Sequence, residues 1–142
     1  MGIFSGIKST FKKTEASIVI QNLFEIQGRA GLFQYDSAKI ANQLISHVWE
    51  QTPDIFDGKF GVRPHKLSVA AVALGNGFYV FHKDSSLRAS CLIALGEILK
   101  TIGVNGALFP FNNVDHRLFD SAMQMFTEEA EQAEAREGKL FG

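Results

Sequence analysis

The stretch PHKLSVAAVALGNGFYVFH, residues 64–82, decides the fold class of this chain. Its first part is rich in alanine and valine, two glycines then flank Asn76, and FYVFH has the composition of a strand. One solution is a β-hairpin over residues 67–82 that turns at the glycines. Alanines are poor strand residues and a lone hairpin is only marginally stable, so we predict a helix instead. Its small residues would let a neighbouring helix approach closely.

Helical periodicity on both sides of this stretch indicates an all-α protein. Apolar residues recur at helical spacing in five further segments, residues 3–13, 14–27, 37–52, 85–103 and a last helix from about residue 113. Glycine or proline marks most of the connections between them. We therefore expect a single domain, residues 1–142, built as an irregular bundle of five or six helices. The alternative is an α+β fold that contains the hairpin at residues 67–82.

The segment 14–27 has an unusually apolar composition for a helix. Thr14 is placed to cap it, Gly28 and Gly31 end it, and its apolar residues cover most of the circumference. These residues are Ala16, Ile18, Val19, Ile20, Leu23, Phe24 and Ile26. A helix that is hydrophobic all round is usually buried on all sides. The pattern predicts a central, well-buried helix.

Composition and charge narrow the class of protein. The 142 residues are 46% hydrophobic and 20% charged, which is typical of a globular domain and too apolar for a disordered chain. The net charge of −1 provides no field to attract nucleic acid. One cysteine, Cys91, suits a reducing compartment. With no secretory core segment and no run long enough to span a bilayer, we predict a cytoplasmic protein.

The opening segment, residues 3–13, is amphipathic and basic. Four apolar residues follow helical spacing beside three lysines, and the segment has no acidic residue. Docking of this face on the protein's own body is favoured, because a short tether raises the effective concentration of the segment. Contact with an anionic membrane surface is the alternative, at about 1 kcal/mol for each lysine.

The residues that could act in catalysis or bind a metal or cofactor do not form a known motif. The four histidines form no HExxH or CxxC-type array, and the glycine pairs at 75–77 and 103–106 match no phosphate loop. His116 and Asp120 share a helix face but lack further ligands, and Cys91 lies on an apolar face where it acts as a small hydrophobe. We assign no catalytic, cofactor-binding or metal-ligating residue.

The function that this pattern favours is a non-enzymatic protein–protein interaction module, such as an adaptor, a regulator or a small subunit, with homodimerisation as one form. The candidate surface is Ile3, Phe4, Ile7, Phe11, Leu108, Phe109 and Phe111. The acidic end, residues 127–142, is expected to project from the body. One alternative is a peripheral membrane protein that uses residues 3–13. Another is a domain or enzyme that binds an apolar ligand in a pocket lined by Phe24, Phe78, Phe81, Phe119 and Phe126.

Overall fold

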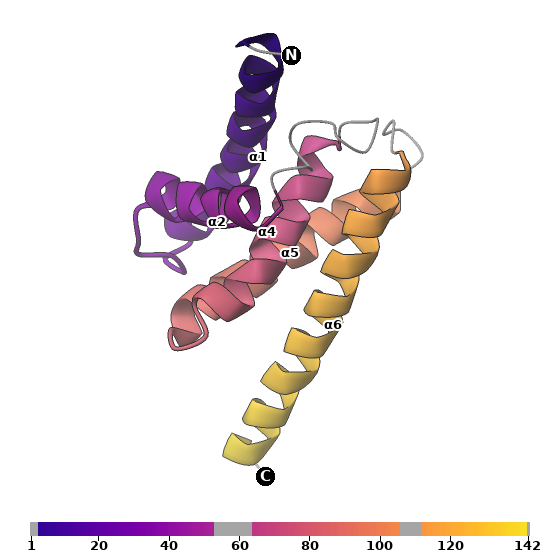
Figure 1. The fold of residues 1–142 in the computed structure, drawn as a ribbon. Coiled ribbons are helices and arrows are strands. Elements are labelled where there is room, and N and C mark those ends of the chain that lie inside the picture. Colours follow the sequence, from indigo (N-terminus) through magenta and orange to yellow (C-terminus); the bar gives the residue numbers. More distant parts are fainter. Residues whose placement is uncertain (1–2, 53–63, 106–111, 142) are drawn as a thin grey trace.

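A computed structural model describes residues 3–52, 64–105 and 112–141, with side chains for 14–52, 64–103 and 112–136. Within these ranges every regular element is a helix, and the ends of α1 and α6 that carry the termini lie at opposite ends of the molecule (Figure 1). The helices are α1 (Ile3–Arg29), α2 (Ser37–Gln51), α4 (Lys66–Val80), α5 (Ser85–Asn105) and α6 (Asn113–Phe141). The all-α fold is confirmed, and α4 replaces the alternative hairpin.

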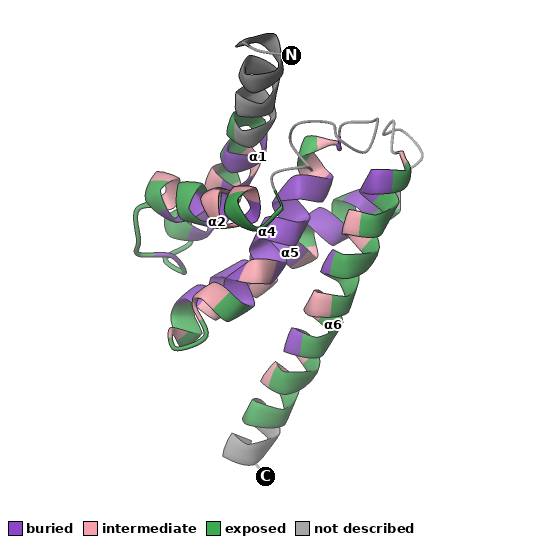
Figure 2. Ribbon diagram, viewed as in Figure 1, coloured by how far each residue is buried: buried purple, intermediate pink, exposed green. Residues whose placement is uncertain are grey.

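Helix α4 is the centre of the bundle. It contacts all four of the other described helices, which surround it in Figure 1. Every residue from Ser68 to Gly75 is buried, so the middle of this helix is enclosed on all sides (Figure 2). The segment that the sequence analysis places at the centre, residues 14–27, instead lies at the side of the bundle. Helix α4 lies at the centre instead because its alanines and glycines let neighbouring helices approach it closely from several directions.

The glycines of α4 are the points of closest approach. The helix runs through Gly75 and Gly77 without a break. A Cβ atom on Gly75 would lie 3.0 Å from the sulfur of Met125 in α6, and one on Gly77 would lie 2.7 Å from Cys91 Sγ in α5. The absence of a side chain at these two positions therefore lets α5 and α6 pack against α4, as the sequence predicts.

Helix α1 is one continuous helix, which corrects the expected division at Thr14. No glycine or proline interrupts the chain between Gly6 and Gly28, so nothing forces a boundary there. The helix ends where Gly31 adopts a positive φ of 78°. Leu32 N donates to Gln27 O at 2.8 Å and Gly31 N donates to Gly28 O at 3.0 Å, the bond pattern of a Schellman motif.

The starts of α2 and α5 are both capped by aspartate. Asp36 accepts a hydrogen bond from Lys39 N at 3.1 Å and so caps α2. Asp84 accepts one from Leu87 N at 3.0 Å and so caps α5. This backbone hydrogen bond is the main reason why the pKa of Asp84 is lowered. Helix α5 also continues past Gly103, its expected end, to Asn105.

Among the described residues, no helix combines the length and the apolar character needed to cross a bilayer.

Candidate interaction surface

The structure does not describe the side chains of the interaction surface that the sequence predicts. Ile3, Phe4, Ile7 and Phe11 belong to α1, but their side chains are not described. The ALFPF loop, with Leu108, Phe109 and Phe111, lies outside the described ranges altogether. Neighbouring residues whose side chains are described form an exposed apolar surface on α1 and α5.

Helix α1 leaves part of its apolar circumference uncovered. Ala16, Ile20 and Phe24 are fully buried, whereas Ile18 is 49% exposed and Ile26 is 55% exposed. Ile18, Asn22 and Ile26 are four residues apart, so they form one exposed strip, here called the outer face of α1. The prediction that this helix is buried all round is wrong, because Ile18 and Ile26 are about half exposed.

The position of α2 explains why the outer face stays open. Helix α2 packs on the side of α1 that carries Ser17, whose hydroxyl donates to Asn42 Oδ1 at 2.7 Å. Helices α4 and α5 cover another side, where Gln27 Nε2 donates to the carbonyl oxygen of Ser90 at 3.0 Å. Ile18 and Ile26 lie on neither of these sides, which accounts for their exposure.

An open groove runs beside the outer face. It has a volume of about 270 Å³ and is lined by three helices: by Val19, Asn22 and Leu23 of α1, Leu67 of α4, and Glu97, Ile98 and Thr101 of α5. Most of these residues are apolar, and Glu97 adds one carboxylate. Asn22 belongs to both the groove and the outer face, so the two are continuous.

Helix α5 adds a further exposed apolar residue beside the groove. Ile93 is 46% exposed and precedes Glu97 by four residues, so both lie on the same side of α5. Exposed isoleucines thus occur on α1 and α5, two of the three helices that line the groove. This arrangement can bind an apolar surface.

No protein-family model, curated protein or solved structure matches this chain.

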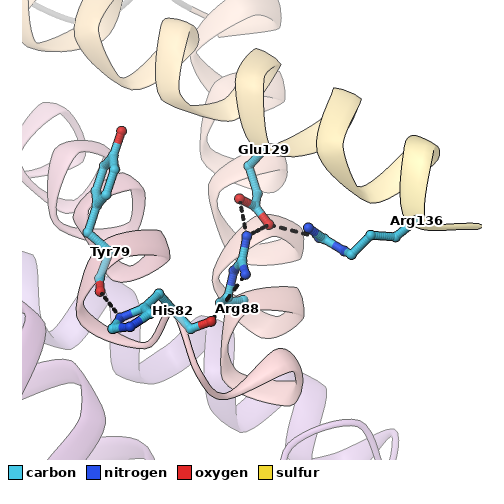
Figure 3. Close-up of polar contacts among 5 residues, drawn as sticks. All are labelled: Tyr79, His82, Arg88, Glu129 and Arg136. Carbon is cyan, nitrogen blue, oxygen red and sulfur yellow. Dashed lines mark hydrogen bonds and ion pairs between the residues drawn. The ribbon is translucent and has the colours of Figure 1, made fainter.

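A second cleft, of about 300 Å³, lies between α4, α5 and α6 and brings titratable side chains together. Arg88 Nη2 donates to both carboxylate oxygens of Glu129 at 2.8 Å, and Arg136 donates to one of them at 3.1 Å (Figure 3). Arg88 Nη1 also donates to the carbonyl oxygen of His82 at 3.2 Å. Figure 3 shows the Tyr79 hydroxyl directed away from this cluster.

This cluster connects α5 to α6 through ion pairs. The Glu129 side chain is 6% exposed, and both of its oxygens accept hydrogen bonds from guanidinium groups. These charge-assisted hydrogen bonds hold the Glu129 carboxylate in place between α5 and α6. We interpret the cluster as the contact that fixes α6 to the start of α5.

Asp115 is a buried polar residue that sequence reasoning missed. Its side chain is fully buried, and its oxygens accept from the backbone N–H of Asn112 at 3.0 Å and of His65 at 2.6 Å. Asn112 Oδ1 accepts from Asp115 N in return, which makes a capping box at the start of α6. The spacing of Asn112 and Asp115 is a signal for that cap, but the bond to His65, fifty residues away, has no local signal.

The other candidate residues are placed as follows. Cys91 is buried, and burial raises the pKa of its thiol to about 12, so it is not a nucleophile at neutral pH. In the part of the chain that is described, no three His, Cys, Asp or Glu residues lie together as metal ligands. Phe24 stacks on Phe33 with ring centroids 4.5 Å apart.

The remaining phenylalanines of the hypothetical pocket are spread over two helices and a turn. Phe78 lines the second cleft, and Phe81, Phe119 and Phe126 are half-buried against the core. Neither the α1–α5 groove nor the second cleft is lined by more than one of the five.

Proposed function

We propose that this protein is a non-enzymatic interaction module, and that its binding surface consists of the outer face of α1 and the adjoining groove. The observation that carries the proposal is the exposure of Ile18 and Ile26 on a helix whose composition is typical of full burial. Burial of one isoleucine side chain contributes about 1.5–3 kcal/mol when complete. About half of that remains to be gained at each of these positions.

The chemistry of the surface favours a protein partner. Helix-in-groove recognition uses apolar anchors at helical spacing, and the groove between α1 and α5 supplies an apolar floor for such anchors. Glu97 at the groove and Glu15 on α1 favour a partner segment that carries lysine or arginine. We place this association in the cytoplasm, because the single buried cysteine is suited to a reducing compartment.

The test compares two kinds of exposed apolar residue. The variant Ile18→Asp/Ile26→Asp changes the outer face of α1, and Met123→Asp changes an exposed methionine of α6 that lies outside this surface. Both proteins and the wild type are isolated from the native cell under mild conditions, and their masses are measured. Hydrogen exchange then locates any segment that the complex protects.

We expect the wild type and Met123→Asp to be isolated in a complex of defined stoichiometry in which α1 amides are protected. The variant Ile18→Asp/Ile26→Asp should be isolated as a lone, folded chain. A wild type that is itself a lone chain, or a complex that is unaffected by the isoleucine substitutions, would contradict the proposal.

A further inference from the structure

We infer that the outer face of α1 binds the outer face of α1 in a second copy of this chain, with the two helices antiparallel. The inference rests on the proposed function and names its partner. It follows from the continuity of α1, from the exposure of Ile18 and Ile26 and from the distribution of charge along the helix.

The continuity of α1 excludes one occupant of the exposed surface. Because the helix runs from Ile3 to Arg29, residues 3–13 continue along its axis and cannot fold back onto Val19 and Leu23 of the same chain. Docking of this segment within its own chain, which the sequence analysis favours, is therefore not available at this groove. The same segment of a second copy has no such restriction.

The length of α1 is sufficient for a pair of helices. At about 1.5 Å per residue, the 27 residues of α1 are about 40 Å long, enough for several turns of contact.

The charges of α1 set the direction of pairing. Residues 3–13 carry three lysines and no acid, whereas residues 14–29 carry Glu15, Glu25 and Arg29, which leaves one net negative charge. An antiparallel pair places the basic half of each copy over the acidic half of the other. A parallel pair would place lysines against lysines. The antiparallel pair is also isologous, so it closes as a dimer.

A membrane surface fits this helix less well. An anionic surface attracts the lysines of the first half but repels Glu15 and Glu25. The exposed Ile18 and Ile26 belong to the acidic half, so insertion of the whole outer face would bring both glutamates to the surface.

The first measurement is the mass of the purified full chain by analytical ultracentrifugation over a wide concentration range. We expect a reversible dimer in the wild type and in Met123→Asp. The variant Ile18→Asp should raise the dissociation constant by about 100-fold or more, because two-fold symmetry makes each substitution act twice. A single-chain mass at every concentration, or a dimer insensitive to Ile18→Asp, would overturn the inference.

The second measurement uses charge reversal to identify the partner. Replacement of Lys8, Lys12 and Lys13 by Glu should weaken the dimer, and so should Glu15→Lys/Glu25→Lys. The variant that combines both sets should dimerise again, because complementarity is restored with opposite signs. Circular dichroism and thermal unfolding verify that each variant is folded.

Sedimentation with phosphatidylserine vesicles separates the membrane alternative from self-association. At a membrane, Glu15→Lys/Glu25→Lys would strengthen binding and the combined variant would not restore it. That result, or loss of dimerisation in the combined variant, would overturn the inference. A monomer that still forms the isoleucine-dependent complex with another protein would leave the proposed function intact. If neither assembly forms, both proposals fail.

Discussion

Replacement of Gly77 by alanine should destabilise the protein, although alanine is the better helix former. In an exposed helix the exchange of glycine for alanine stabilises by about 0.5–1 kcal/mol. At Gly77 the added Cβ would lie 2.7 Å from Cys91 Sγ and 3.2 Å from Leu44 Cδ2, and both neighbours are fully buried. Overpacking in such a site costs about 1–3 kcal/mol. The net loss should therefore be about 0.5–2 kcal/mol.

Gly103 of α5 provides a matched control. It is exposed, and nothing lies within 4 Å of the position that a Cβ would take. The variant Gly103→Ala should keep only the gain in helix propensity and stabilise the protein by about 0.5 kcal/mol. The difference between the two variants isolates the packing cost at the contact of α4 with α5 and α2.

The measurement is urea unfolding followed by circular dichroism, in which a shift of the midpoint at constant slope reports stability. A change of 1 kcal/mol corresponds to about 4 °C in Tm for a domain of this size. The loss at Gly77 should be smaller in a Cys91→Ala background, with a coupling of about 1 kcal/mol, because the closest atom is then absent. If Gly77→Ala is as stabilising as Gly103→Ala, the close packing around α4 described here is incorrect.

Three further predictions concern buried polar groups. Asp115→Ala should lower the free energy of unfolding by about 2–4 kcal/mol, since two backbone N–H groups lose a charged acceptor, and a loss under 1 kcal/mol in urea would contradict this. Arg88→Ala should lower the free energy of unfolding by about 3 kcal/mol and Arg136→Ala by less than 1 kcal/mol, because Arg88 makes the more buried ion pair. Equal losses in urea would contradict the assignment of this ion pair as the contact that fixes α6 to α5. Because burial raises the pKa of Cys91 to about 12, only the unfolded chain ionises this thiol above about pH 9. Stability should therefore fall from about pH 9 towards pH 12, and by less in Cys91→Ala, as urea titrations at several pH values would show.

Local sequence patterns are sufficient to predict most helices of this fold. Asp36 and the apolar stripe that follows it define α2, and the small residues of 66–80 define α4 against the hairpin alternative. Both depend on interactions within one segment. Thr14 is an example of a wrong local prediction. Its side chain is suited to an N-cap, yet it lies inside α1, because no glycine or proline directly before it interrupts the helix.

Burial and long-range pairing are harder to predict from sequence. The apolar residues of α1 form more than one face, and periodicity does not indicate which face a neighbouring helix covers; Ile18 is therefore exposed while Ile20 is buried. The acidic stretch of residues 127–138 has no bulky apolar residue, yet it contains the buried Glu129. Its partner Arg88 is 41 residues away, which is beyond the reach of any local pattern.

The position of Asp115 has a consequence for engineering the chain. It ties the start of α4 to the start of α6, at His65 and Asn112, immediately after the segments 53–63 and 106–111. Both helices are thus anchored at the residues where those segments enter the bundle. Peptide tags or fluorescent reporters inserted into either segment should leave the helical core in register, because each doubling of the number of residues between two anchored helices adds only about 0.6 kcal/mol of loop-closure entropy.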